Sequence, residues 1–239
     1  MLKIIHEIRN CNQGCYLDRY VHSLNTRVNG QIRKISIQEL RQGRPLIDDW
    51  RNQSVLLISQ APSKQAWVDH KLSSLENSFF SEFLLPRIFP GETVTEAIEK
   101  WKQTVFWIHT ANCYPFARKV KNRWRDKLPN LICANKYMSR IVNVFKPELI
   151  ILMSRSSTQF FACSIKKLIK SNSKSYYPSL NSIIEWQFEN KSMLTIYPKN
   201  EDTQYFAIAV PHAVNWHDLN EKERYVYEQI VYRIRSIVQ

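Results

Sequence analysis

Residues 141–157 have the sequence IVNVFKPELIILMSRSS, which joins the end of a helical pattern to a buried strand. Ile141, Val142 and Phe145 recur at helical spacing, and Pro147 then ends the helix because proline has no N–H to donate. Residues 149–154 begin with five apolar residues and show no polar alternation, which is typical of a strand covered on both faces. The stretch therefore predicts a helix over 131–145 followed by a strand, as in α/β proteins.

The same alternation continues along the chain. Thr93 and Glu96 have the spacing of a capping box, which predicts that a helix begins there. We expect one α/β domain over residues 1–239, with a largely parallel sheet and a polar loop over 170–182. The other predicted strands are 55–59, 105–111, 193–197 and 206–210, and the other predicted helices are 93–103, 156–169 and 221–238.

Charge indicates the class of partner. The chain has 34 Lys and Arg against 21 Asp and Glu, a net charge of +13. Such an excess favours an anionic partner, with nucleic acid first and a membrane surface second. The apolar runs are far shorter than the roughly 20 residues of a membrane span, and early charges at Lys3, Glu7 and Arg9 interrupt any signal-peptide core. We therefore expect a cytoplasmic monomer that binds DNA and no membrane.

Composition excludes several kinds of site. The four glycines are far apart, which excludes the glycine-rich dinucleotide fingerprint and the P-loop. The sequence has no His-Glu-x-x-His motif and no zinc-type pair of Cys-x-x-Cys units. Five cysteines, an odd number in a chain for which we expect no export signal, argue against a disulfide framework.

Polar segments follow four of the predicted strands. In open α/β sheets, ligands bind beyond the carboxyl ends of the strands, so these segments are the first candidates for a site. They are residues 59–63 (SQAPS), 109–115 (HTANCYP), 154–157 (SRSS) and 211–216 (PHAVNW).

With these segments in this order, the chain resembles the uracil-DNA glycosylase superfamily. Residues 59–63 resemble its first motif, which is Gly-Gln-Asp-Pro-Tyr in one branch and Gly-Glu-Ala-Pro-Gly in the iron–sulfur (family-4-like) branch. Residues 112–116 (NCYPF) resemble the Asn-x-Cys-Pro-Leu of the single-strand-selective monofunctional branch, and residues 210–215 (VPHAVN) resemble the His-Pro-Ser turn of the second motif. The resemblance implies a three-layer α/β/α sandwich with a central, largely parallel four-stranded sheet. It also implies a monofunctional DNA glycosylase that flips out uracil or a modified pyrimidine and leaves an abasic site.

The resemblance also assigns roles to residues. His212 would donate a hydrogen bond to the departing base, and Gln60, with Ala61 beside it, would hold the base or position a water. Asn112 carries the donors and the acceptor that reading a pyrimidine edge requires, although an alternative alignment places His109 at that position. Either Tyr114 or Phe116 would stack on the flipped base. The loop residues Val214, Asn215 and Trp216 would contact DNA, with Val214 and Trp216 wedged into the vacated stack.

Three positions depart from the family pattern. Ala61 and Ala66 stand where the two branches carry the carboxylate that positions the attacking water, and Ser63 replaces a glycine. Asp69 and His70 are close enough in sequence to substitute. The departures leave three alternatives open: a glycosylase for a bulky hypermodified phage base such as glucosylated 5-hydroxymethylcytosine, acting in anti-phage defence; a catalytically inactive DNA-binding module; and an enzyme for free or RNA-borne bases.

The cysteines and the basic residues are the candidates for cluster ligands and for phosphate contacts. Cys11, Cys15, Cys113 and Cys133 resemble, in order, the four ligands of a [4Fe–4S] cluster, although the single-strand-selective branch has the two later cysteines and no cluster. Residues 118–127 are strongly basic and follow the predicted pocket strand, so we expect them to grip DNA phosphates, single- or double-stranded. The predicted phosphate contacts are Arg118, Lys119, Lys121, Arg123 and Arg125, with Lys64 on the first loop.

Overall fold

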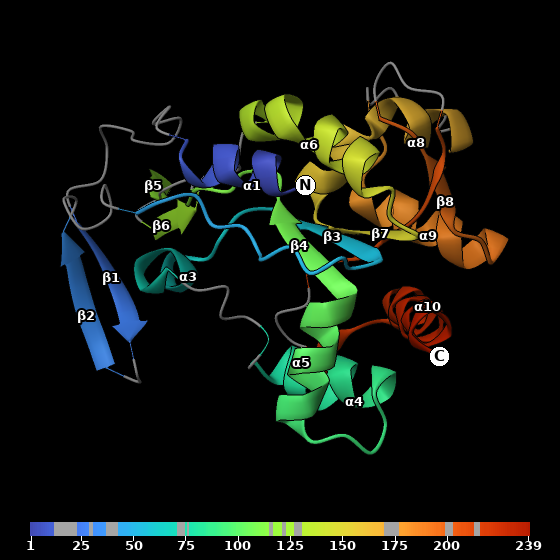
Figure 1. Cartoon of the computed structure of the whole chain (residues 1–239), viewed down its shortest axis with the longest axis horizontal. Coiled ribbons are helices and arrows are strands. Elements are labelled where there is room, and N and C mark those ends of the chain that lie inside the picture. Colours follow the sequence, from blue (N-terminus) through green and yellow to red (C-terminus); the bar gives the residue numbers. More distant parts are fainter. Residues whose placement is uncertain are drawn as a thin grey trace.

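Figure 1 shows the computed structural model of the chain. It describes residues 1–11, 23–28, 31–36, 43–70, 75, 77–114, 117–120, 123–126, 131–169, 177–198, 203–212 and 216–239. For residues 23–28, 31–36, 64, 65, 68, 117–120 and 123–126 it describes the backbone alone.

A five-stranded sheet forms the centre of the molecule, in the order β4-β3-β7-β9-β8. The first four strands are parallel, and β8 pairs with β9 in the antiparallel sense. The α/β class and the positions of the five strands are confirmed, whereas the expected four-stranded sheet gains an antiparallel strand at one edge. The strands are β3 (Val55–Ser59), β4 (Val105–His109), β7 (Leu149–Met153), β8 (Leu194–Ile196) and β9 (Tyr205–Ala209).

Apolar residues cover both faces of this sheet because successive side chains of a strand point to opposite sides. Leu57, Trp107 and Ile151 pack with residues of η2 (Phe79–Leu84, a π-helical segment), α4 (Leu85–Ile88), α5 (Val94–Thr104) and α10 (Glu221–Val238). Leu56 and Phe106 pack with α1 (Leu2–Arg9), α6 (Ile132–Phe145) and α8 (Ala162–Leu168) on the other face. Figure 1 shows α1, α6 and α8 above the sheet and α4, α5 and α10 below it.

The predicted helix boundaries follow local chemistry. Thr93 and Glu96 form the capping box at the start of α5, which confirms that signal. Helix α6 ends at Lys146, whose φ of 54° lies in the left-handed region, one residue before Pro147. Helix α10 has the predicted bounds and begins with a second capping box, between Asn220 and Glu223.

Two local predictions were wrong in part. The expected helix over 156–169 divides at Phe161 into α7 (Arg155–Phe160) and α8. The expected loop over 170–182 ends early, because Ser179 caps α9 (Leu180–Asn190). Residues 170–176 lie outside the described part of the chain.

Several elements were not predicted from the sequence. They are α1, α3 (Lys64–Asp69), η2, α4, α9, η3 (Trp216–Asp218) and two antiparallel hairpins, β1 (Ser23–Val28) with β2 (Gln31–Ser36) and β5 (Ala117–Val120) with β6 (Arg123–Asp126). Within the described residues, no helix combines the length and the hydropathy needed to cross a bilayer.

Candidate active site at the carboxyl edge of the sheet

The loops after β3 and β4 run side by side where the strands end, at the edge marked by the arrowhead of β4 in Figure 1. The Thr110 amide donates to the Ser59 carbonyl at 2.9 Å, and the Ala111 amide donates to the Gln60 carbonyl at 3.2 Å. These bonds extend the pairing of β3 with β4 into the loops. Polar segments distant in sequence are therefore held together at one edge of the sheet.

Buried hydroxyl groups connect these loops to the loop after β7. Thr110 Oγ1 donates to the Gln60 carbonyl oxygen at 2.6 Å and shares a second hydrogen bond with Ser156 Oγ at 3.0 Å. Ser156 is in turn hydrogen-bonded to Ser154, and Ser154 to Ser157. The serines of segment 154–157 therefore bond to other protein groups, and they help to fix the loop that follows β4 and carries Asn112.

His109, at the end of β4, and His212, in the loop after β9, lie near enough at this edge for a charge on one to affect the pKa of the other. Burial lowers the pKa of His109 to about 3, and repulsion from a charge on His212 contributes to the shift. The Leu46 carbonyl partly opposes it. Burial also lowers the pKa of His212, whose ring keeps an exposed surface although protein surrounds much of it. The His109 ring is therefore neutral at neutral pH, and the neutral form of the His212 ring is favoured.

The His109 ring has an unused polar atom. Its side chain is 4% exposed, and its Nδ1 is buried without a hydrogen-bond partner among the described residues. The ring is roughly parallel to that of Trp107, 6.2 Å away between centroids, and the Trp107 indole N–H donates to Ser59 Oγ at 2.8 Å. A buried nitrogen without a partner is costly, so this position is suited to a ligand that supplies the missing hydrogen bond.

The Asn112 side chain is engaged within the protein. Its Oδ1 accepts from the backbone N–H of His109 at 3.2 Å, and its Nδ2 contacts Cys133 Sγ at 4.0 Å. The side chain is buried, and its amide is engaged with the loop and with helix α6. The other candidate for reading the base, His109, is within electrostatic range of His212.

The remaining residues of the first two motifs occupy defined places. Gln60 and Ala61 are half-buried directly after β3, and the Ser63 hydroxyl accepts from the Ala66 N–H at 3.1 Å as the cap of α3. Tyr114 is 1% exposed, so its ring is a packed part of the interior. Phe116 lies outside the described residues.

Trp216 belongs to a column of stacked rings. Its ring stacks on Phe83 at 5.3 Å between centroids, and His217 lies against it at 3.7 Å. The Arg87 guanidinium covers Phe83 at 4.3 Å. Both neighbours of the indole are therefore protein groups, which is unlike the wedge expected from the sequence; Val214 and Asn215 lie outside the described residues.

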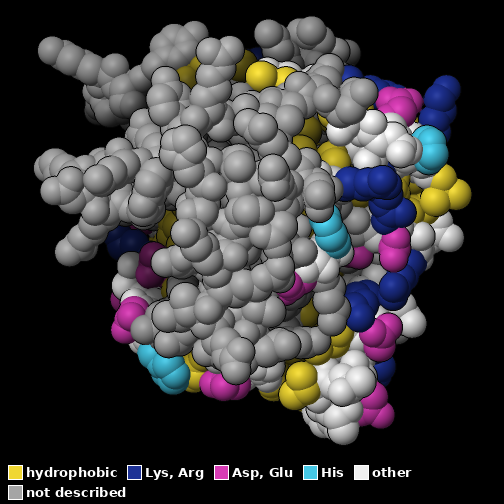
Figure 2. All heavy atoms as spheres, turned by 90° about the vertical axis from the view of Figure 1, so that its left-hand side faces the viewer, with side chains coloured by type: hydrophobic (Ala, Val, Ile, Leu, Met, Phe, Trp, Pro, Cys, Tyr) yellow, Lys and Arg dark blue, Asp and Glu magenta, His cyan; other side chains and the backbone are white. Residues whose placement is uncertain are grey.

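The strongly basic segment includes a hairpin, in which Arg118 pairs with Arg125 and Val120 with Arg123. The structure describes only the backbone of Arg118, Lys119, Arg123 and Arg125, and of Lys64 in α3, and Lys121 lies outside it. Figure 2 shows the molecule from the left-hand side of Figure 1. Lys and Arg side chains of described residues gather along its right-hand margin, with Asp and Glu between them.

The expected cluster ligands are described in part. Cys11 and Cys113 are half-buried, Cys133 is buried, and Cys15 lies outside the described residues. Among the side chains that are described, no three His, Cys, Asp or Glu come together in a way that could hold a metal ion. The described thiols alone therefore do not form the donor set that a [4Fe–4S] cluster needs.

The sequence did not predict that residues 43–48 form one side of the site. The Leu46 amide donates to the Asn112 carbonyl at 2.6 Å, and Asp48 pairs with Trp107 along the outer edge of β4 through its amide (3.3 Å) and its carboxylate (3.4 Å). The segment's sequence, GRPLID over residues 43–48, contains a signal: two apolar residues isolated between a Gly-Arg-Pro turn and an acid.

Compared with protein-family models and with curated proteins, the chain matches none.

Proposed function

We propose that the protein is a monofunctional DNA glycosylase, which flips a uracil or modified pyrimidine nucleotide out of DNA and hydrolyses its N-glycosidic bond. The observation that carries the proposal is that His109 lies within electrostatic range of His212 at the carboxyl edge, with His109 Nδ1 buried and unpartnered among the described residues. The resemblance of the surrounding motifs to uracil-DNA glycosylases supplies the reaction. The three-layer sandwich of that family is part of the proposal.

The reaction needs a hydrogen-bond donor for the leaving base, and His212 can supply it. Water adds to C1′ of the sugar, the bond from C1′ to the base nitrogen breaks, and the base leaves as an anion. A hydrogen-bond donor aimed at the base oxygen stabilises that charge most strongly where water is scarce. A neutral His212 ring carries one N–H, so in this proposal it donates to the leaving base without giving up its proton.

His109 is the proposed reader of the base. Its Nδ1 would exchange one hydrogen bond with the polar edge of the flipped base, and Asn112 would hold the His109 backbone through its amide oxygen. The buried rings of Trp107 and His109 would exclude water from that side. Because the net charge is +13, we propose DNA as the partner, bound by a cytoplasmic monomer whose affinity falls steeply with salt.

Excision of a base from defined oligonucleotides tests the proposal. Purified protein is incubated with single- and double-stranded DNA containing uracil, 5-hydroxymethylcytosine or its glucosylated form, and alkali then reveals abasic sites. We expect His212→Ala to lower the excision rate by about 100-fold or more, as the loss of one well-placed donor does. His217→Ala, on the same loop but stacked on Trp216, is the matched control and should keep the wild-type rate.

Two outcomes would overturn the proposal. If no base is excised while DNA is still bound, the chain is better explained as a binding module without catalysis. If His212→Ala excises as fast as the control, the site is elsewhere. An iron and acid-labile sulfide assay on the same preparation tests the expected cluster.

A further inference from the structure

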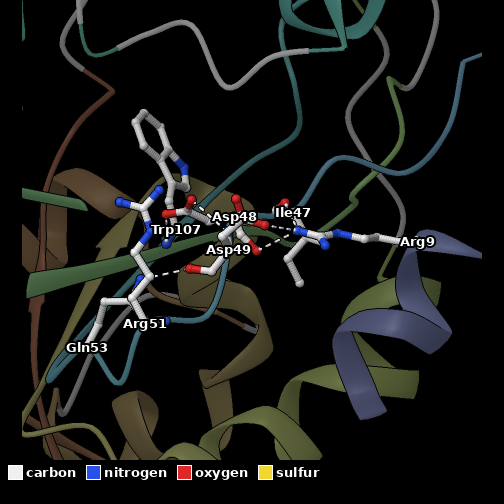
Figure 3. Close-up of polar contacts among 7 residues, drawn as sticks. All are labelled: Arg9, Ile47, Asp48, Asp49, Arg51, Gln53 and Trp107. Atoms are coloured by element: carbon white, nitrogen blue, oxygen red, sulfur yellow. Dashed lines mark hydrogen bonds and ion pairs between the residues drawn. The ribbon is translucent and has the colours of Figure 1, made fainter. Parts of the chain in front are cut away.

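The two histidines of the proposed site are held in different ways. His109 belongs to β4, which pairs with β3 on one side and with the segment containing Asp48 on the other. Figure 3 shows this second contact, in which Asp48 lies beside Trp107 and Arg9 reaches the Asp48 carbonyl. Main-chain hydrogen bonds therefore fix the strand that carries His109, whereas His212 lies beyond the end of β9.

The backbone just before His212 cannot be fixed by strand pairing. In the described part of the chain, the main-chain pairing that continues β9 ends at Val210, whose amide donates to the Leu152 carbonyl at 3.0 Å. Pro211 comes next and has no N–H, so it can offer its carbonyl oxygen but no donor. The Pro211 carbonyl is therefore the main-chain group through which the protein can hold the chain directly before His212.

A buried tyrosine binds that carbonyl. Tyr227 of α10 is 0% exposed, and its hydroxyl donates to the Pro211 carbonyl oxygen at 2.5 Å. Its ring packs among apolar side chains, 5.1 Å from Phe79 and 6.0 Å from Phe83 between centroids. A hydroxyl buried in such surroundings is costly unless it is hydrogen-bonded, and the packed rings restrict the direction in which it points. The bond to Pro211 is thus directed by the core of the protein.

The same rings also contact the chain on the other side of His212. Phe83 stacks on Trp216 at 5.3 Å between centroids. In sequence, His212 therefore lies between two residues, Pro211 and Trp216, that are both attached to the aromatic cluster of η2 and α10. Such attachment matters for a hydrogen-bond donor, because a misplacement of about 1 Å can lower the rate of an enzyme by about 100-fold.

We propose that Tyr227 is a positioning residue for His212: by binding the Pro211 carbonyl, its hydroxyl keeps the His212 ring directed at the leaving base. This inference rests on the proposed function, because it takes His212 as the donor to that base. Tyr227 acts through the backbone of Pro211 and touches neither the base nor the sugar.

Kinetics of one conservative variant test the role. Tyr227→Phe removes the hydroxyl and leaves the ring, so it removes the bond to Pro211 alone. With the oligonucleotide that the wild type cleaves fastest, we expect kcat to fall about tenfold, less than for a full 1 Å misplacement. The KM should change little, because a donor to the leaving base acts mainly in the transition state.

A second buried tyrosine supplies the matched control. Tyr205 is at the other end of β9, and its hydroxyl donates to the Val142 carbonyl at 3.5 Å. Tyr205→Phe therefore also removes a buried hydroxyl bonded to a backbone carbonyl, far along the strand from His212. It should keep the wild-type kcat, even where urea unfolding shows that both variants lose stability.

The titration of His212 gives a readout that does not need catalysis. Burial lowers the pKa of His212, and a hydrogen bond to its own backbone carbonyl partly opposes this. His109, which lies within electrostatic range, has a pKa of about 3 and stays uncharged in the neutral range. Because burial is the larger cause, a loosened His212 should titrate closer to 6.5. By NMR, we expect its pKa to rise by about 0.5 in Tyr227→Phe and to stay unchanged in Tyr205→Phe.

The wild-type chain supplies a further measurement if Tyr227→Phe does not fold. The Tyr227 hydroxyl proton is buried and hydrogen-bonded, so NMR should show that it exchanges slowly with water. Fast exchange would overturn the inference, because the bond to Pro211 would then not be maintained.

The remaining outcomes separate this inference from the proposed function. A wild-type kcat in Tyr227→Phe, equal losses of kcat in the two tyrosine variants, or an unchanged pKa of His212 would show that Tyr227 does not position His212. If the wild type excises no base, the glycosylase proposal fails, and the titration of His212 still decides whether Tyr227 holds its ring in place.

Discussion

The ring of His109, at the end of β4, lies near enough to the ring of His212, after β9, for a charge on His212 to lower the pKa of His109. Burial is the larger cause of the same shift. One buried neutral imidazole and one more exposed imidazole thus lie within electrostatic range of each other at the edge of a parallel sheet. This pair has consequences for stability as well as for the proposed reaction.

His109→Phe should show separately what His109 contributes to stability and what it contributes to base excision. The pKa of His109 is about 3 in the folded chain, below its ordinary value of 6.5, so between these pH values only the unfolded chain binds the proton. The stability contributed by neutral His109 is therefore fully present above about pH 6.5. Between that pH and about pH 3 it falls by about 1.4 kcal/mol for each pH unit of acidification. Urea unfolding from pH 7 to pH 5 should show that the variant loses less stability than the wild type, and parallel curves would contradict this. We also expect the variant to excise base far more slowly.

Thr110→Val should destabilise the buried hydroxyl network. Valine has nearly the same shape but no hydroxyl, so the Gln60 carbonyl and the Ser156 hydroxyl each lose a hydrogen bond. We expect the free energy of unfolding to fall by about 1–3 kcal/mol. Thr110→Ser keeps the hydroxyl and serves as the control, with a smaller loss. If valine and serine were equally destabilising in urea titrations, the hydroxyl would not be the cause.

Asp48→Asn should change how stability depends on pH. Burial raises the pKa of Asp48, outweighing the hydrogen bonds from the Asp49 and Trp107 amides, which lower it. An acid with a raised folded pKa contributes stability below its ordinary pKa of 3.8 and loses that contribution as the pH rises through the folded value. The asparagine variant has no such loss. The melting temperature of the variant, relative to that of the wild type, should therefore be higher at neutral pH than at acidic pH. If the difference between the two melting temperatures is the same at both pH values, the prediction is wrong.

Gly43→Ala should be destabilising because Gly43 lies against the indole of Trp67. A Cβ on residue 43 would lie 2.2 Å from Trp67 Cε2, which requires the ring or the backbone to shift. We expect a loss of about 1–3 kcal/mol, as for other overpacked sites. In a Trp67→Phe background the atoms that clash are absent, so the added cost of alanine should shrink. Additive losses in the double variant would show that the clash is not responsible.

The strands were predictable because β3, β4 and β7 are buried on both faces and β8 and β9 are mostly buried, which leaves apolar runs in the sequence. Helix α9 was missed for the opposite reason. Its Gln187 lies in the interior and bonds both to the Ala209 carbonyl (2.9 Å) and to the Ala209 amide (3.0 Å), as a neighbouring strand would. A polar residue in an inward position interrupts the helical pattern, and only the tertiary structure shows why it is there.

The loops of the candidate site were likewise predictable, but the orientation of their side chains was not. His109 and Asn112 are three residues apart, and composition gives no reason to prefer one of them. Asn112 is engaged because Cys133, at the start of a distant helix, lies next to it, and because the His109 amide needs an acceptor. The wall formed by residues 43–48 depends in the same way on contacts between distant parts of the chain.

The pairing of Asp48 with Trp107 also affects how copies of the chain meet one another. A free strand at the edge of a sheet presents unpaired N–H and C=O groups, to which another chain can add a strand. At β4 the segment containing Leu46 and Asp48 occupies such groups and places a carboxylate beside them. At the opposite edge, β8 is only three residues long. Self-association by edge-to-edge pairing is therefore disfavoured at both ends of the sheet, which protects the parallel strands from aggregation once they have formed.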